Sequence, residues 1–319
     1  MTKGKICIVL NPEAGHGKAQ RLLPLIIDAF GSQGIVPQVM VSRGPRHPEE
    51  LARQACEQEY KMVVAMGGDG TVGEVANGIL TSGIPGVAMG VIPAGTGNDF
   101  AVGNSLVEGW ESAVRVLSKP SFKRMDVLRF QDDAGFSRYA TNSIGMGYDA
   151  YVVKRVAELG SRRFGPISYM VEAFRGLLTF SPATLGIKIG DDGPGQDSEG
   201  VWLFAITNSE KFGGGLKVSP GASSWDGKLD YAYLAGVRRM ALIRLILLVK
   251  SGNHVGRPGV FRGQSSEITV QAPRGFPCHI DGDTVDAVYP VTVKVLPGKL
   301  PVVVDGANSL EGREPEVSA

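Results

Sequence analysis

The first third of the chain alternates short runs of apolar, β-branched residues with longer amphipathic stretches. The apolar runs predict strands at 5–10, 36–41, 61–66 and 86–92. The amphipathic stretches predict helices at 17–30, 48–59, 71–81 and 108–118, the third of them begun by a capping box of Thr71 and Glu74. Alternation of this kind is typical of a parallel sheet covered by helices.

Beyond Pro120 the pattern changes to short strands separated by turn residues, which indicates an antiparallel, β-sandwich-like arrangement with helical insertions. We therefore expect an α/β domain over 1–123 and a β-rich domain over 124–310. The last strand could pack back on the first domain, and 311–319 would be a frayed tail. The predicted strands are 122–130, 136–144, 183–190, 200–207, 228–235, 258–262, 265–271 and 290–296, and the helices are 148–180, with a break at 160–165, and 238–251.

Charge and cysteine usage narrow the class of protein. The 33 Lys+Arg and 32 Asp+Glu residues leave a formal net charge of +1, so no global field favours a nucleic-acid partner. Cys7, Cys56 and Cys278 show no C-x-x-C spacing, which argues against a disulfide framework and a zinc cluster and favours the cytoplasm. The longest apolar stretch, 240–249, contains Arg244 and is about half of the roughly 20 residues that a spanning helix needs.

Many of the 44 glycines cluster in loops, and one such cluster predicts chemistry. Gly67–Thr71 lies between a predicted buried strand and a predicted helix, where backbone N–H groups and the helix N-terminus can bind a phosphate. Asp69 would repel that anion unless a cation lay between them, which indicates Mg²⁺. The alternative is a tight turn in which Asp69 caps the helix.

A second glycine loop, Pro93–Phe100, follows the next predicted strand, and two such loops can enclose one nucleotide. Two other motifs are rejected. Gly15–Lys18 is similar to a Walker A loop, but it lacks the leading glycine and the hydroxyl residue after the lysine. Gly145–Ala150 matches G-x-G-x-x-A, yet no βαβ unit with an acidic ribose partner follows it, so we expect no dinucleotide site there.

Taken together, these segments resemble the diacylglycerol kinase catalytic family, especially its bacterial soluble lipid kinases, over nearly the whole chain. The GGDGT loop alone would be less specific, because NAD kinases and 6-phosphofructokinases have related loops. The matching segments are 11–15, 67–71 with 74–78, 93–100, 142–150, Asn208 with 213–215, 226–230 and 279–283.

The resemblance implies an NAD kinase/diacylglycerol kinase-like fold and a kinase that binds ATP on its N-terminal domain. Asp281 matches the family's catalytic aspartate, which accepts the proton of the attacking lipid hydroxyl. Asp69, Asp99 and Asp283 would surround the catalytic Mg²⁺. The positions that match nucleotide contacts are Ser42, Gly67, Gly68, Asp69, Gly70, Thr71, Val72, Gly73 and Thr96.

The same resemblance implies a separate structural Mg²⁺ at Asp226, with the carbonyl oxygens of Ser223 and Lys228. The alternative is a turn capped by Asp226. Three residues depart from the family pattern: Asp283 replaces a glutamate, Gly73 an asparagine and Val102 an arginine.

The function that the resemblance implies is an ATP-dependent lipid kinase, with 1–123 as the nucleotide-binding domain, 124–310 as the lipid-substrate domain and diacylglycerol as the acceptor by family name. Phosphatidylglycerol, a sphingoid base or a soluble polyol remain alternative acceptors, and the oligomeric state, a homo-oligomer included, stays open. Two other functions are a kinase of a soluble substrate, similar to NAD kinase, and a non-catalytic nucleotide-binding regulatory module. The four retained acids argue against the module: Asp69, Asp99, Asp281 and Asp283.

A peripheral membrane contact is also expected, because basic pairs flank the apolar helical stretches 164–180 and 240–249. These pairs are Lys154-Arg155, Arg162-Arg163 and Arg238-Arg239. The alternative is that they are ordinary solvated charges beside core helices.

Overall fold

The structure is a computed structural model that describes residues 5–159, 166–191 and 193–306. The chain divides into two compact units. The first unit contains the described residues up to Met125 and from Gly298 on, and the second unit is Asp126–Pro297. Two long strands, β5 (Ser121–Asp132) and β15 (Val291–Val304), belong to both units because the chain passes through them from one unit to the other.

The first unit is built on a parallel sheet in the order β2-β1-β3-β4. The end of β15 adds to this sheet, since Val302 pairs in parallel with Met89. All residues of β1, β3 and β4 are buried, as expected for strands that are covered on both faces. The strands are β1 (Ile6–Leu10), β2 (Gln38–Val41), β3 (Met62–Gly67) and β4 (Ala88–Pro93).

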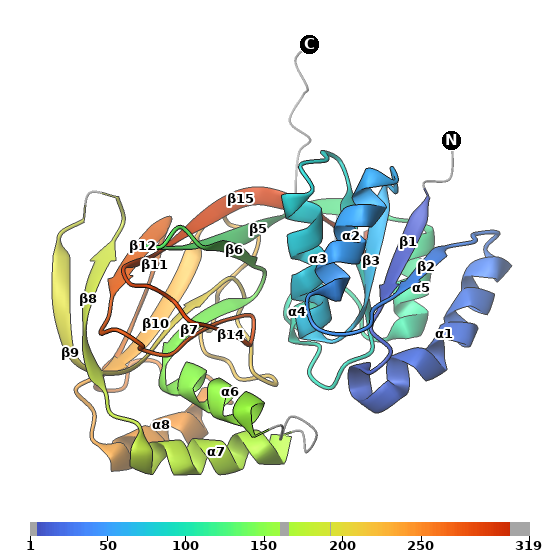
Figure 1. Cartoon of the computed structure of the whole chain (residues 1–319). Coiled ribbons are helices and arrows are strands. Elements are labelled where there is room, and N and C mark those ends of the chain that lie inside the picture. Colours follow the sequence, from blue (N-terminus) through green and yellow to red (C-terminus); the bar gives the residue numbers. More distant parts are fainter. Residues whose placement is uncertain (1–4, 160–165, 192, 307–319) are drawn as a thin grey trace. The chain divides into compact units, whose positions relative to one another are not determined.

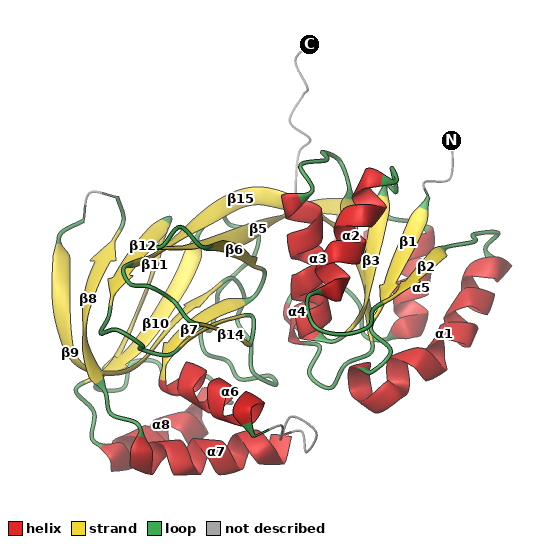
Figure 2. Ribbon diagram, in the orientation of Figure 1, coloured by secondary structure: helices red, strands yellow, loops and turns green. Residues whose placement is uncertain are grey.

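Helices cover both faces of this sheet. Figure 2 shows α2 and α3 together on one face, and α1 and α5 on the other. Buried side chains such as Ile26 and Phe30 of α1 and Leu117 of α5 fill the space against the strands. The helices are α1 (Ala14–Ser32), α2 (His47–Glu57), α3 (Asp69–Thr81), α4 (Asp99–Gly103) and α5 (Trp110–Ser118).

The predicted capping box at Thr71 is wrong. Helix α3 begins at Asp69 with the extended residue Gly68 as its N-cap, and no side chain caps it. Thr71 therefore lies inside the first turn, and its hydroxyl accepts a hydrogen bond from the Asn11 side-chain amide at 3.1 Å.

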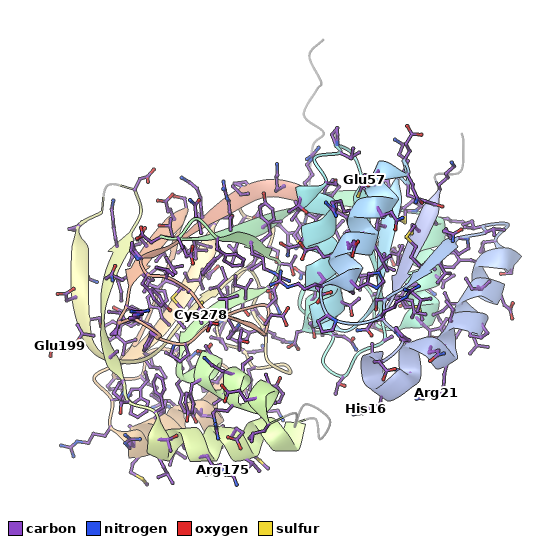
Figure 3. The ribbon with its side chains drawn as sticks, viewed as in Figure 1. His16, Arg21, Glu57, Arg175, Glu199 and Cys278 are labelled. Atoms are coloured by element: carbon purple, nitrogen blue, oxygen red, sulfur yellow. The ribbon has the colours of Figure 1, made fainter. Side chains whose placement is uncertain are left out.

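The second unit is an antiparallel β structure in which β9 pairs with β7, β8 and β10. Helices α6, α7 and α8 lie together at one side of these strands (Figure 1). Buried aromatic side chains, among them Phe204 and Trp202, fill the core, and Cys278, labelled in Figure 3, is buried among them. The remaining elements of this unit are β6 (Ser137–Ala140), β7 (Ser143–Gly147), α6 (Tyr148–Glu158), α7 (Pro166–Thr179), β8 (Ala183–Ile189), β9 (Gly195–Thr207), β10 (Leu229–Ala235), α8 (Arg239–Val249), β11 (Val260–Ser265), β12 (Glu267–Gln271), β13 (Cys278–Ile280) and β14 (Asp283–Val285).

Two features of the second unit differ from the sequence prediction. The single strand expected over 136–144 is two strands, β6 and β7, separated at Thr141 and Asn142. The hairpin of β13 and β14 was not expected, because each strand has only three residues. The predicted helix break at 160–165 and the tail at 311–319 lie outside the described residues.

Among the helices of the described residues, none combines the length and the apolar character required to cross a bilayer.

Candidate functional site

The parallel sheet of the first unit has a switch in strand order at β1, because β2 pairs with one side of β1 and β3 with the other. In open α/β sheets, ligands bind outside the carboxyl ends of the strands at such a point. Asn11 follows β1 there, and Gly68 follows β3. The Asn11 N–H donates to the Met66 carbonyl at 3.0 Å, which holds the two strand ends together. The predicted phosphate loop therefore lies at the switch point.

Three loops meet at this edge with backbone packed on backbone. The Ala94 N–H donates to the Gly67 carbonyl at 2.9 Å. A Cβ placed on Gly95 would lie 2.3 Å from the Gly68 Cα, and one placed on Gly15 would lie 2.3 Å from the Ala94 carbonyl oxygen. Real Cβ atoms do not approach so closely, so glycine is required where these loops touch.

Oxygens of two predicted carboxylates lie near Gly97 in this region. A Cβ placed on Gly97 would lie 3.1 Å from Asp69 Oδ2 and 3.9 Å from Asp99 Oδ2. The other oxygen of Asp69, Oδ1, accepts a hydrogen bond from the Phe100 N–H at 2.9 Å, which fixes the direction of the carboxylate. Carboxylate oxygens are the kind of ligand that Mg²⁺ prefers, and Mg²⁺ commonly keeps several waters beside one or two of them.

The other predicted nucleotide contacts have different degrees of exposure. Gly70 and Thr96 are exposed. Ser42 is buried after β2, where its N–H donates to the Leu10 carbonyl at 2.8 Å. Three more predicted contacts are buried near the start of α3: Thr71, Val72 and Gly73.

Two asparagines shape these loops and were absent from the predicted contacts. Asn11 binds the Thr71 hydroxyl. Asn98 is left-handed, with φ of 57°, and its side chain closes the second loop. Its Oδ1 accepts from the Gly95 N–H at 2.9 Å, and its Nδ2 donates to the Gly95 carbonyl at 3.0 Å. The signal was present, because asparagine tolerates the left-handed region and hydrogen-bonds to nearby backbone.

The predicted catalytic residue of the second unit, Asp281, lies at the tip of the β13–β14 hairpin. Ile280 pairs with Asp283, which leaves Asp281 and Gly282 as a two-residue loop. Both have positive φ, 49° and 84°. A type I′ hairpin requires this of both loop residues, and Asp-Gly is one of its preferred dipeptides. The backbone at Asp281 is therefore explained by the turn.

The Asp281 carboxylate accepts four hydrogen bonds from Thr141 and Asn142, which join β6 to β7, and from Ser143, the first residue of β7. Oδ2 accepts from the N–H and the hydroxyl of Thr141, at 2.8 and 3.1 Å. Oδ1 accepts from the N–H groups of Asn142 and Ser143, at 2.9 and 2.8 Å. Burial raises the pKa of the Asp281 carboxyl, and these four donors oppose that rise because they favour the charged form. The break in the predicted strand thus supplies the donors.

Asp283 lies beside a cation of the protein. Its Oδ2 is 3.6 Å from a guanidinium nitrogen of Arg138, whose side chain is 6% exposed. The Asp283 side chain is 36% exposed. The Asp283 carboxylate is therefore accessible to a ligand from solvent, and part of its negative charge is compensated by Arg138.

Asp226, which precedes β10, has the contacts of a capped turn. Its Oδ1 accepts from the Lys228 N–H at 3.0 Å, and its Oδ2 accepts from the Gln264 side chain at 3.4 Å. The Ser223 hydroxyl accepts from the Trp225 N–H at 3.3 Å. One exposed carboxylate used in this way fits a turn better than a metal cage, and the Mg²⁺ at this position stays a prediction. Within the described ranges, no group of three or more His, Cys, Asp and Glu side chains could hold a metal ion.

Comparison with known families matches both halves of the chain. Residues 5–130 match the family described as "Diacylglycerol kinase catalytic domain". Residues 142–304 match the family described as "YegS C-terminal NAD kinase beta sandwich-like domain". The two matches together include the glycine loops, the Asp281 hairpin and the Asp226 turn.

Individual relatives match along most of their length. The chain is 29% identical to YtlR of Bacillus subtilis over 289 residues, which cover 86% of this chain and 92% of that protein. It is 27% identical to a diacylglycerol kinase of Mycobacterium tuberculosis over 301 residues, 94% of this chain and 95% of the relative. A crystal structure of a diacylglycerol kinase from Bacillus anthracis superposes with a TM-score of 0.71 at 18% identity, covering 96% of this chain and 99% of that one.

Proposed function

Because this chain belongs to the diacylglycerol kinase family of lipid kinases, we propose that it transfers the γ-phosphoryl group of ATP to a lipid hydroxyl. The observation that carries the proposal is the pair of carboxylate oxygens, from Asp69 and Asp99, that lie 3.1 and 3.9 Å from a Cβ placed on Gly97. Paired carboxylates next to glycine-rich backbone suit a polyphosphate that arrives with its cation.

In this proposal the edge of the first unit binds ATP. Backbone N–H groups at the start of α3 and in the Gly95 loop would face the phosphates, where a helix N-terminus favours negative charge. Asp69 and Asp99 would hold Mg²⁺, which when bound neutralises charge on the transferred phosphoryl group. Gly73 provides no side-chain amide, so any contact from that position is made by the backbone.

Asp281 is the proposed general base. A substrate hydroxyl must donate to one of the Asp281 oxygens. A carboxylate offers about four lone-pair positions, and those of Asp281 already accept from Thr141, Asn142 and Ser143. Three of these donors are backbone N–H groups. The fourth, the Thr141 hydroxyl, can rotate away, and it makes the longest of the four bonds. We propose that the lipid hydroxyl takes its place at Oδ2, where burial of the carboxyl favours proton uptake.

The acceptor proposed first is diacylglycerol, because a relative with 27% identity is named a diacylglycerol kinase. Phosphatidylglycerol, a sphingoid base and a soluble polyol are the alternatives. The test is transfer from radiolabelled ATP to each of these acceptors, with and without a Mg²⁺ chelator. Label in diacylglycerol that requires Mg²⁺ supports the proposal. Label confined to a polyol or to NAD would replace it with a soluble-substrate kinase, and no transfer to any acceptor would remove it.

We also propose that the protein meets its lipid at a membrane surface, through a helix face of α7 and α8. This helix face consists of five exposed apolar side chains. Those on α7 recur every four residues. Helix α8 contacts the end of α7, because Arg239 of α8 donates a hydrogen bond to the Leu177 carbonyl of α7. The five are Met170 (58% exposed), Phe174 (62%), Leu178 (80%), Met240 (76%) and Leu247 (74%).

The charge around the helix face complements anionic headgroups. Helix α8 has no acidic residue, and Arg238, Arg244 and Lys250 are exposed on it or at its ends. Arg175 is exposed on the outer side of α7 (Figure 3), although it also pairs with Glu172 at 2.8 Å. Exposed apolar and basic side chains on neighbouring helices are typical of proteins that lie on a membrane.

The basic pairs predicted from sequence contribute unequally to this surface. Lys154 lies 3.7 Å from Asp286, and Arg155 pairs with Glu158 and Glu172. Arg239 lies over the ring of Trp202, 5.3 Å from its centre. Arg162 and Arg163 lie outside the described residues.

Co-sedimentation with vesicles tests the helix face. Phe174→Ser should weaken binding to vesicles of phosphatidylcholine and phosphatidylglycerol by about tenfold, the value of burying one large apolar side chain. Phe122→Ser is the matched control, because Phe122 is 56% exposed on β5. Added salt should weaken the binding of wild type to these anionic vesicles. Equal binding of the two variants and wild type would remove the helix face from the proposal.

A further inference from the structure

A buried histidine contacts the turn that carries Asp281. His279 lies on β13, and its side chain is 3% exposed. Its Nδ1 is 3.3 Å from the Gly282 backbone nitrogen, which donates to it. Its Nε2 is 3.2 Å from Oδ2 of Asp149, in the first turn of α6. A chain of two hydrogen bonds therefore leads from Asp149 through the imidazole ring to the hairpin turn.

The partners of the ring assign its tautomer. A backbone N–H can only donate, so Nδ1 must present its lone pair to Gly282. A neutral ring then carries its proton on Nε2 and donates it to Asp149. The carboxylate of Asp149 favours this tautomer and orients the ring, as carboxylate partners do for histidines in other sites.

Gly145 leaves the space in which this pair sits. It lies directly across from His279 in the β7–β13 pairing. A Cβ placed on Gly145 would lie 2.1 Å from Asp149 Oδ2 and 2.3 Å from His279 Nε2. The stretch Gly145–Ala150, which matched a dinucleotide fingerprint in sequence, thus provides the bare backbone and the carboxylate for the pair.

The turn also has hydrogen bonds to residues outside itself. Asp281 has the positive φ, 49°, that a type I′ turn requires, and its neighbours fix the side chain and the next residue. The segment 141–143 holds the Asp281 side chain, and the Ser143 carbonyl accepts the Asp281 N–H at 2.8 Å. His279 holds the following residue, Gly282.

We propose that Asp149 and His279 are positioning residues for phosphoryl transfer. They fix Gly282, and through it they fix the direction of the Asp281 carboxylate. This inference rests on the proposed function, because it takes Asp281 as the base.

Nitrogen NMR of the intact protein tests the hydrogen-bond chain without an activity assay. Long-range proton–nitrogen correlations of the histidine rings should show His279 at about pH 7 with a bare Nδ1 and a protonated Nε2. His279→Asn assigns the signals. A proton on Nδ1, or on both nitrogens, would overturn the inference, since Gly282 could not then donate to the ring.

Kinetics test the consequence for catalysis. Asp149→Ala and His279→Ala should each lower kcat by about tenfold, the effect of losing one well-placed hydrogen bond, while KM for ATP stays unchanged. His279→Asn should recover part of this loss, because its side-chain oxygen can take the place of Nδ1 and accept from Gly282. A purely structural role would not separate the asparagine from the alanine variant.

The matched control is His254→Gln. His254 is also a buried histidine of the second unit, and its Nε2 is 3.1 Å from the Val218 carbonyl. The kcat of His254→Gln should equal that of wild type. Full kcat in Asp149→Ala and His279→Ala beside an inactive Asp281→Asn would overturn the inference alone. A wild-type protein without lipid kinase activity would overturn the proposed function and the inference with it.

Discussion

The glycine edge of the first unit and the Asp281 hairpin of the second unit position polar groups in opposite ways. At the glycine edge, side chains are absent so that backbones can touch, as at Gly68 and Gly95, and oxygens of Asp69 and Asp99 lie near Gly97. At the hairpin, the carboxylate of Asp281 already accepts four hydrogen bonds. The geometry of the first region depends on bare backbone, and that of the second depends on hydrogen bonds that hold one group still.

The two regions should therefore fail for different reasons. Added atoms should damage the glycine edge, because Gly15 and Gly95 have no room for a Cβ. Lost charge or lost donors should damage the hairpin, because its geometry depends on hydrogen bonds. Of the four predictions that follow, from the largest expected effect to the smallest, the first three test the two regions and the fourth tests a buried histidine outside both.

Asp281→Asn should lower kcat by about 10²–10⁴, because an amide cannot accept the proton of the lipid hydroxyl. It should also cost about 1–3 kcal/mol of unfolding free energy, because the new NH₂ group would face protein donors. Steady-state kinetics and denaturant unfolding measure the two effects. Thr141→Ala is the control: it removes the rotating hydroxyl without putting a methyl group in its place, and it should retain most of kcat. More than about a tenth of wild-type kcat in Asp281→Asn would contradict its role as the base.

Asp69→Asn should raise the Mg²⁺ concentration needed for half-maximal activity by about tenfold or more, on the scale of one contact to a charged group. The side chain keeps its shape and its acceptor for the Phe100 N–H. Asp28→Asn, at an exposed position of α1, is the control. An unchanged Mg²⁺ dependence in Asp69→Asn would mean that the oxygens beside Gly97 do not hold the ion.

Gly95→Ala should lower the unfolding free energy by about 1–3 kcal/mol and raise KM for ATP, because the added Cβ would lie 2.3 Å from the Gly68 Cα. Gly31→Ala in α1 is the control, since no atom lies within 4 Å of a Cβ there. The control should leave KM unchanged and should match or exceed wild-type stability. If both variants behave like wild type, backbone contact does not set the geometry of the glycine edge.

The smallest effect concerns His254. Burial lowers its pKa from 6.5, and the charge of Arg262 acts in the same direction. The unfolded chain therefore binds more protons than the folded one below about pH 6.5, and stability present above that pH is lost as the pH falls through the folded pKa. Urea unfolding at about pH 7.5 and pH 5 should show a smaller loss for His254→Gln than for wild type. Equal losses would assign the acid sensitivity to other groups.

The fold class could be predicted from the sequence because it depends on local patterns. The comparisons with known proteins confirm it. Buried parallel strands read as continuous apolar runs, as β1, β3 and β4 do. The capping box at Thr71 was wrong because the local signal ignored the extended Gly68, which starts α3 two residues earlier. Sequence patterns thus predicted where helices and strands occur more accurately than the residues at which they begin and end.

The candidate site was predictable only in part. The Asp281-Gly282 dipeptide is a hairpin signal, but three-residue strands give too short a pattern to support it. The donors of Thr141 and Ser143 and the pairing of Asp149 with His279 join residues more than 120 positions apart, and no local spacing encodes such contacts. The resemblance supplied the position of Asp281, whereas its surroundings required the structure.

The missing side chain at Gly145 also has a consequence for sequence variation in relatives of this protein. Because a Cβ there would overlap both Asp149 and His279, the three positions should vary together. A relative that keeps the aspartate and the histidine should keep the glycine, and a relative with a side chain at this position should have lost the pair. Substitution at the glycine alone should therefore be rarer than replacement of all three.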